Sequence, residues 1–320
     1  MIYRKLGRTG LQMPLMGMGS GGGPDPLGQG SGVPEREIHT LLHRAFDLGI
    51  TFFDTSPGYM DSELILGRAL KDLPRDQLIL STKIPLATSL PGDPVHIMTR
   101  DEVVAAVDHS LSRLKTDYVD IMLMAVAGTE YFDPVVNDQV PVLQDLQRAG
   151  KIRFLGSSEL SRTDWSHEWL GSLLPTGLID VAMVAHNMIN QNAQETVFPF
   201  CVEHDIGVIN IFTVRRVFGI PGRLEEVLAD LMQRGVVPTE AIDIDNPLEF
   251  LLEGDDVGSL IEAAYRYAAY TPGVTTVMNG ANEIPWMEEN ITSVHKGPLG
   301  ENKRRRLTEI FSRVREPIGN

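Results

Sequence analysis

The sequence has little cysteine, little positive charge and no long apolar run, and each shortage excludes a class of protein. Cys201 is the single cysteine among 320 residues, which excludes an intrachain disulfide and a cysteine-rich zinc site. The formal net charge of −15 opposes binding to nucleic acid or to anionic membranes, because both require a basic surface. No window approaches the run of about 18 apolar residues that a membrane span needs.

The first residues, Met-Ile-Tyr-Arg-Lys, lack the apolar segment of a secretory signal, so we expect a cytoplasmic protein. One basic run, Lys303–Arg306, falls in an expected C-terminal helix and is interpreted as a solvated helix face. The apolar content of 42% is sufficient for a large core, in one large α/β domain or two smaller ones. Since no stretch has the composition of a linker, we expect a single domain over residues 1–320.

Helices and strands are expected to alternate along most of the chain. A short hairpin is expected over Tyr3–Gly10 and a first strand over Leu15–Gly17. The other expected strands are Ile50–Phe53, Leu78–Thr82, Tyr118–Met124, Ile152–Gly156, Val181–Ala185, Val208–Phe212 and Val274–Met278. The expected helices are Glu35–Leu48, Ser62–Leu70, Arg100–Leu114, Pro141–Ala149, Arg162–Leu173, Gln194–Glu203, Leu224–Gln233 and Val257–Tyr267.

The expected strands are short and apolar without alternation, which is typical of strands buried on both faces. Eight β/α units fit a closed barrel, but an open doubly wound sheet has the same local pattern, so periodicity leaves the choice open. Two long loops, Ala87–Val95 and Val236–Gly254, are expected to shape access to the site.

A glycine-rich segment, Gly17–Gly22, formally matches the dinucleotide-binding pattern G-x-G-x-x-G. That pattern requires a helix to open within it, whereas the residues that follow, up to Pro34, are rich in proline and glycine. We therefore reject a Rossmann fold and interpret the segment as a loop beside an active site.

Three ionisable residues follow the ends of two neighbouring expected strands. Asp54 and Tyr59 leave the strand Ile50–Phe53 through the turn residues Ser-Pro-Gly, and Lys83 ends the next strand. A lysine cation close to a tyrosine phenol stabilises the phenolate, and a carboxylate can hold the lysine in place. The three residues can therefore form a proton donor.

The motifs around these residues resemble the aldo-keto reductases. The likeness rests on Asp-Thr-Ser-Pro-Gly-Tyr over 54–59, on Ser62-Glu63, on Leu-Gly-Arg-Ala-Leu over 66–70 and on Ser-Thr-Lys over 81–83. It extends from Leu6 to Asn290. The resemblance implies a (β/α)8 TIM barrel with an N-terminal hairpin and a C-terminal helix. It also implies an NAD(P)-dependent oxidoreductase in which Tyr59 is the general acid, supported by Lys83 and Asp54.

The sequence departs from this family at the catalytic histidine. The context Thr-Asp-Tyr-Val-Asp over 116–120 matches, but Ala125 stands where the resemblance places the imidazole. His186, at the end of a later strand, is a candidate replacement, although a histidine beside an apolar strand is more often a packing residue. The missing imidazole puts ordinary ketone reduction in doubt.

The resemblance implies a cofactor pocket that this chain keeps only in part. At the nicotinamide end it keeps Ser158, but Glu159 replaces the family's asparagine, and Met183 replaces a glutamine and cannot hydrogen-bond to the carboxamide. The aromatic platform falls on Ile211, with Phe212 one position on.

At the adenosine end the resemblance points to Gly280, Glu289 and Asn290, with Arg216 and its neighbour Arg215 as candidate pyrophosphate contacts. Glu283 stands where a basic residue for the 2′-phosphate is expected, which favours NAD(H) over NADP(H), or neither.

No metal site is expected. Cys201 and His204 have a C-x-x-H spacing but no further ligands, and His167 and His295 belong to no cluster that the sequence identifies. We expect a small carbonyl or sugar-like substrate, with a weak lean towards aldose dehydrogenases that oxidise the anomeric carbon. Two alternatives stay open: a redox-neutral lyase, dehydratase or isomerase that uses Tyr59, and a non-catalytic binding protein.

Overall fold

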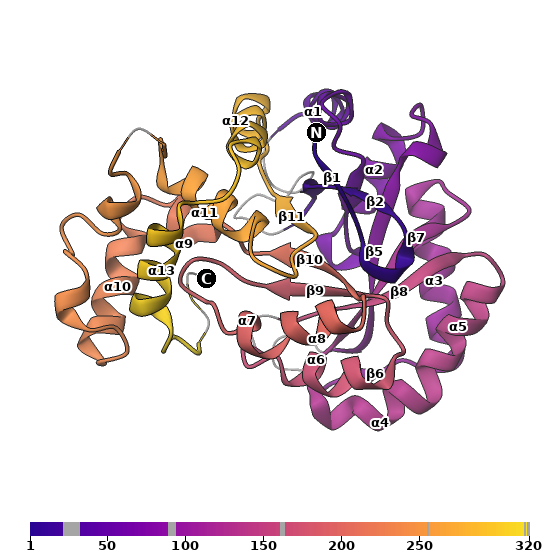
Figure 1. Cartoon of the computed structure of the whole chain (residues 1–320). Helices are drawn as coiled ribbons and strands as arrows, with labels where there is room; N and C mark the ends of the chain where they lie inside the picture. The colour runs from indigo at the N-terminus through magenta and orange to yellow at the C-terminus, as the bar shows by residue number, and fades with distance from the viewer. Residues whose placement is uncertain (22–32, 89–93, 161–163, 255, 317, 319–320) are drawn as a thin grey trace.

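Eight parallel strands close into a barrel in the computed structural model, which describes residues 1–21, 33–88, 94–160, 164–254, 256–316 and 318 (Figure 1). The strands are β3 (Met16–Gly19), β4 (Phe52–Asp54), β5 (Ile79–Thr88), β7 (Val119–Val126), β8 (Ile152–Ser158), β9 (Val181–Ala185), β10 (Gly207–Ile211) and β11 (Thr276–Asn279). Neighbours pair in chain order, and β11 pairs with β3 to close the ring. The expected barrel is confirmed, and the open sheet is wrong.

An N-terminal hairpin covers one end of the barrel. Its strands, β1 (Tyr3–Lys5) and β2 (Gln12–Pro14), pair antiparallel, so the hairpin extends beyond the expected Tyr3–Gly10. Leu6, Leu11 and Met13 join the apolar cluster inside the barrel, whose strand residues are Phe52, Ile79, Ile121, Leu123, Val181, Met183 and Ile209. These strand residues lie mostly near the strand starts, which leaves the carboxyl ends as the open mouth.

Helices pack around the outside of the barrel through their apolar faces. They are α1 (Glu35–Asp47), α2 (Ser62–Ala69), α3 (Arg100–Leu114), α5 (Val140–Arg148), α6 (Glu168–Leu173), α7 (Ala193–Thr196), α8 (Phe198–Glu203), α11 (Leu260–Ala269) and α12 (Ile284–His295). The start of α3 is set by a capping box between Thr99 and Glu102. Among the described residues, no helix is both long and apolar enough to cross a membrane.

Two expected helices are shorter than the sequence pattern suggests. Helix α6 begins at Glu168 because the Asp164 carboxylate accepts the backbone N–H groups of Glu168 and Trp169, at 2.8 and 2.9 Å. The expected helix Gln194–Glu203 is divided into α7 and α8, and α8 carries a proline in its first turn, where the missing N–H is tolerated.

The two expected long loops are partly regular structure. Ala87 and Thr88 extend β5 and pair with β6 (His96–Ile97), whereas residues 89–93 lie outside the described part of the chain. The segment Val236–Gly254 contains short 3₁₀ turns and buries Val237, Ile242, Leu248, Phe250 and Leu251.

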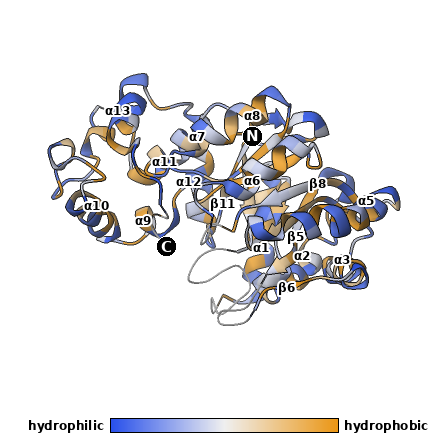
Figure 2. Cartoon of the chain, turned by 90° about the horizontal axis from the view of Figure 1, so that it is seen from below, coloured by the Kyte–Doolittle hydropathy of each residue, from blue (hydrophilic) through white to orange (hydrophobic). Residues whose placement is uncertain are grey.

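That segment belongs to a second apolar cluster beside the barrel. The cluster also contains residues of α9 (Arg215–Gly219), α10 (Arg223–Gln233) and α13 (Glu301–Phe311), which lie to one side of the strands (Figure 1). Helices α10 and α13 each have a polar and an apolar side (Figure 2). This helical layer is anchored by hydrophobic burial, so the segment is part of the packed structure rather than a free loop.

Candidate functional site

Asp54 and Lys83 form a buried ion pair at the barrel mouth. Asp54 is the last residue of β4 and pairs in register with Ser81 of β5. The Lys83 Nζ atom lies 2.7 Å from Asp54 Oδ2 and donates to the Thr55 carbonyl at 2.9 Å, while the Ser81 hydroxyl donates to Asp54 Oδ1 at 2.6 Å. Both carboxylate oxygens are therefore satisfied, and the ammonium is fixed by two strands.

Tyr59 lies against this pair. It ends a single 3₁₀ turn, Pro57–Tyr59, whose cap Ser56 accepts the N–H of Gly58 at 3.1 Å. The Lys83 Nζ atom is 5.0 Å from the centroid of the Tyr59 ring. The structure thus brings all three expected residues together. Asp54 ends β4 as expected, whereas Lys83 lies within β5, which continues to Thr88 and does not end at the lysine.

The environment keeps Lys83 charged. Burial alone lowers its pKa, but the negative charge of Asp54 and the hydrogen bonds to Asp54 and Tyr59 outweigh burial and leave the pKa above its ordinary value. A permanently charged ammonium beside a phenol is the arrangement that stabilises phenolate during proton transfer.

Gly21 has a structural role that the sequence pattern did not reveal. A Cβ atom at Gly21 would lie 2.2 Å from Cε2 of the Tyr59 ring, so the backbone at this position packs directly on the catalytic candidate. A Cβ at Gly19 would come no closer than 3.5 Å to a side chain. The glycine-rich segment therefore continues from β3 to the face of Tyr59, and residues 22–32 lie outside the described part of the chain.

The Gly21→Ala variant is expected to displace the Tyr59 ring and lower kcat by roughly tenfold or more, since small misplacements of reacting groups are costly. Gly19→Ala is the matched control, because an alanine there meets only ordinary contacts. Steady-state kinetics and melting temperatures of both variants check this. Equal kcat values for the two variants would contradict it.

The position of the missing histidine is inside the barrel. Ile121 and Leu123 of β7 both belong to the interior cluster, so Ala125, two residues on, points to the same side near the mouth. His186 does not replace it. It is fully buried between Phe198 and Tyr267, at ring distances of 5.2 and 5.5 Å, and burial lowers its pKa to about 3. His186 is therefore a neutral packing residue, outside the group formed by Asp54, Tyr59 and Lys83.

Ser158 and Glu159, at the end of β8, differ in how far their side chains are hydrogen-bonded. Among the described residues, the Ser158 hydroxyl has one long hydrogen-bond contact, 3.5 Å, to the Glu159 carbonyl. The Glu159 carboxylate is fully engaged: Oε2 accepts the Ala185 N–H at 2.8 Å, and Oε1 contacts His167 Nδ1. His167 Nε2 in turn lies 3.1 Å from Asn192 Oδ1. The position of His167 in the sequence does not reveal this partner, because the pairing joins segments that spacing cannot relate.

This buried pair predicts a pH dependence of stability. Burial lowers the pKa of His167, but its bond to Glu159 outweighs burial and raises it, while burial raises the pKa of Glu159. A group with a raised pKa in the folded state stabilises the protein below its unfolded pKa, about 6.5 for histidine, and loses this as pH rises through the folded pKa. Because both shifts are upward, the Glu159→Gln/His167→Gln variant should lose more melting temperature at acid pH, below about 6, than at alkaline pH. A pH-independent difference would contradict this.

The other residues expected to contact the cofactor differ in their burial. Met183 is buried within the interior cluster and packs among strand residues. Phe212 is half-buried in a left-handed conformation (φ 66°), stacks on Trp165 at 6.2 Å and carries the Arg215 guanidinium 3.6 Å from its ring centroid. Arg216 is exposed at the start of α9.

The residues expected to meet the adenosine end of a dinucleotide lie around the start of α12. A Cβ at Gly280 would meet no atom within 4 Å, so space is open there. Glu289 is exposed, whereas Asn290 is buried and donates to Asn279 Oδ1 at 3.2 Å. Glu283 precedes α12, and no described side chain caps the start of this helix, so the N–H groups there other than that of Pro285, which has none, are available to a phosphate. The open helix start and the available Ser158 hydroxyl fit a dinucleotide.

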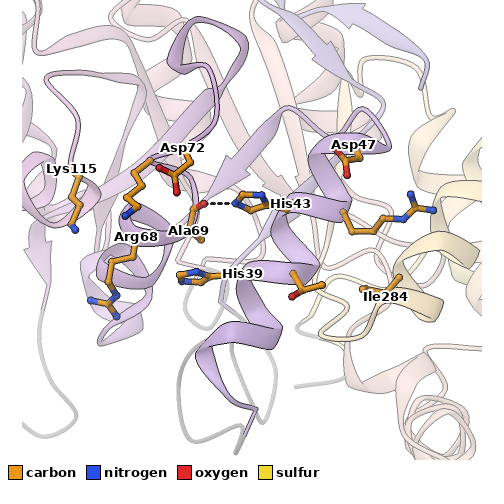
Figure 3. Close-up of a pocket in the computed structure, with 11 residues that line it drawn as sticks. His39, His43, Asp47, Arg68, Ala69, Asp72, Lys115 and Ile284 are labelled. Carbon is orange, nitrogen blue, oxygen red and sulfur yellow. Dashed lines mark hydrogen bonds between the residues drawn. The ribbon is translucent and has the colours of Figure 1, made fainter.

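A cavity of about 720 Å³ lies away from the mouth, on the outer surface between α1 and α2 (Figure 3). His43 Nε2 is bonded to the Ala69 carbonyl at 2.7 Å, and Arg68 pairs with Glu35 at 2.6 Å. Since both histidines and both arginines that line it already have partners and Tyr59 is not among its lining residues, we do not assign the site there. No group of three metal-ligating side chains occurs within the described part of the chain.

Comparisons with known proteins match nearly the whole chain. The model of the Aldo/keto reductase family matches residues 16–311. L-galactose dehydrogenase of Arabidopsis thaliana is 33% identical over 323 residues, covering 99% of this chain and 95% of that protein. NADH-specific methylglyoxal reductase of Escherichia coli (strain K12) is 30% identical over 228 residues, covering 65% of each. The holo form of aldo-keto reductase AKR11C1 from Bacillus halodurans shares the fold, with a TM-score of 0.73, 23% identity and coverage of 98% and 97%.

Proposed function

Because this chain belongs to the aldo/keto reductase family, an oxidoreductase family, we propose that it catalyses NAD(H)-dependent interconversion of a small carbonyl compound and its alcohol, with Tyr59 as general acid and base. The observation that carries this proposal is the buried Lys83 ammonium, held 2.7 Å from Asp54 and 5.0 Å from the Tyr59 ring centroid. An ion pair between Lys83 and Asp54 does not require a phenol beside it. Proton transfer by Tyr59, in contrast, requires a cation close to the phenol oxygen.

In the direction of oxidation, the Tyr59 phenolate takes the proton of the substrate hydroxyl, and Lys83 stabilises the charge on the phenol oxygen before transfer. Asp54 fixes the ammonium. The chemistry that a bound dinucleotide would supply here is acceptance of the hydride from the substrate carbon. Ser158 and the start of α12 would hold it. In the direction of reduction, Tyr59 returns the proton to the carbonyl oxygen.

Two observations support NAD(H) as the cofactor. Glu283 places a carboxylate beside the start of α12, where it would repel a 2′-phosphate. The Escherichia coli relative, 30% identical, is named as NADH-specific. Glu283→Arg should improve NADP(H) binding relative to NAD(H), measured by quenching of tryptophan fluorescence.

We propose a sugar oxidised at its anomeric carbon as the substrate class. The relative that is 33% identical over almost the whole chain is named L-galactose dehydrogenase. Ala125 provides no hydrogen-bonding group, and the hydroxyl groups of a sugar can provide hydrogen bonds that an imidazole would otherwise provide.

The test is a screen of aldoses and small carbonyl compounds with NAD⁺, NADH and their phosphorylated forms, following nicotinamide absorbance. Aldose-dependent NADH formation supports the proposal. If neither dinucleotide binds below millimolar concentration, hydride transfer is untenable. A redox-neutral reaction at Tyr59 then becomes the better account, since Ala125 and the engaged Glu159 both reduce contacts that hydride transfer uses.

A further inference from the structure

Glu63, the second residue of α2, is a fully buried carboxylate close to the site. Its two oxygens bind different elements: Oε1 accepts the Thr82 hydroxyl of β5 at 2.7 Å, and Oε2 accepts Arg113 Nε of α3 at 3.1 Å. A buried carboxylate is costly unless it is paired in this way. Glu63 therefore joins the strand that carries Lys83 to helix α3.

Arg113 continues this connection to the Tyr59 turn. Its Nη2 atom donates to the main-chain carbonyl of Met60, the residue after Tyr59. Met60 has φ 47° and ψ −104°, an unfavourable conformation for a residue with a side chain, and the residue is 72% exposed. Since Met60 has little packing of its own, its strained backbone must be held by its surroundings.

The position of Arg113 itself is rigid. A Cβ at Gly67 of α2 would lie 2.3 Å from the Arg113 carbonyl, so α2 and α3 are in direct backbone contact. The path Thr82–Glu63–Arg113–Met60, which we call the Glu63–Arg113 bridge, thus links the residue before Lys83 to the residue after Tyr59.

We propose that Glu63 and Arg113 are positioning residues for proton transfer: they hold the Tyr59 turn in register with the strand that carries Lys83. Neither touches the reacting atoms. This inference rests on the proposed role of Tyr59, because only a residue that must meet the Lys83 ammonium and the substrate in fixed geometry needs its turn held in a strained conformation.

Arg75 offers a matched control. It binds the fully buried carboxylate of Asp120 at 2.9 Å and also the carbonyls of Leu78 and Tyr118, so it too pairs with a buried acid between strands β5 and β7. These residues precede or begin their strands, at the end of the barrel opposite the mouth. Loss of Arg75 should therefore cost stability without affecting the Tyr59 turn.

The experiment compares Arg113→Met, Arg113→Lys, Glu63→Gln and Arg75→Met by steady-state kinetics, melting temperature and backbone deuterium exchange of the segment 57–61. For Arg113→Met we expect kcat to fall roughly tenfold to a hundredfold with KM little changed, and exchange in this segment to increase. Arg113→Lys should restore part of the kcat and part of the protection from exchange. Glu63→Gln should show the same fall in kcat and the same increase in exchange, each to a smaller extent. Arg75→Met should lower the melting temperature but leave kcat and the exchange of this segment unchanged.

Equal kcat and equal exchange in Arg113→Met and Arg75→Met would overturn the proposal. If Arg113→Met does not fold, Glu63→Gln decides, because it keeps the shape of the side chain: wild-type kcat and exchange would then overturn it. Failure of the proposed function can be distinguished from failure of this inference. Full activity in a variant without the Tyr59 phenol would remove the catalytic role, whereas the exchange measurement still shows whether the bridge holds the turn.

Discussion

Tyr59→Phe is expected to lower kcat/KM by about two to four orders of magnitude, the range that a positioned general acid or base contributes. The ring remains, so its packing on Gly21 and its contact with Lys83 are kept, and only the phenol oxygen is lost. The melting temperature should change little. Kinetics in both directions with the substrate found by the screen provide the measurement.

A second measurement separates binding from chemistry. NAD(H) affinity should be unchanged in Tyr59→Phe, because the residues proposed to hold the dinucleotide lie at the end of β8 and at the start of α12. A binding protein without turnover would also keep this affinity, but it would show no activity to lose. Wild-type rates in Tyr59→Phe would refute Tyr59 as the proton donor.

Lys83→Met is expected to abolish activity and also to destabilise the protein by about 3–5 kcal/mol, the usual cost of removing one partner of a buried pair. The side chains of Lys83 and Asp54 are only 10% and 7% exposed, so the Asp54 charge would be left without its cation in a largely dry site. Urea denaturation monitored by tryptophan fluorescence measures this loss.

The double variant Asp54→Asn/Lys83→Met is the control that distinguishes the two effects. Because it removes both charges, it should regain most of the stability while staying inactive. If activity returned with stability, the ion pair would be a structural feature and the proposed role of Lys83 would be wrong. If the double variant regained neither stability nor activity, the hydrogen bonds of Ser81 and Thr55 would depend on the side chains of both Asp54 and Lys83.

The local pattern of the chain was sufficient for most of the strands and for the grouping of Asp54, Tyr59 and Lys83. Apolar runs followed by turn residues mark strand ends, and in parallel strands those ends share one edge. The limits of α6 could not be predicted in this way, because Asp164 caps it only in the folded loop. The extension of β5 likewise depends on pairing with β6.

The sequence by itself determined the alternation of buried strands and amphipathic helices, because the periodicity of apolar residues depends on neighbours along the chain. Its motifs also determined the three residues at the mouth. Only the tertiary structure decided which polar residues pair across distance. Glu159 meets His167, Glu63 meets Arg113 and Gly21 meets Tyr59, while His186 is buried away from the catalytic group. Such pairings depend on barrel closure and on the register of separate segments, and no local spacing encodes them.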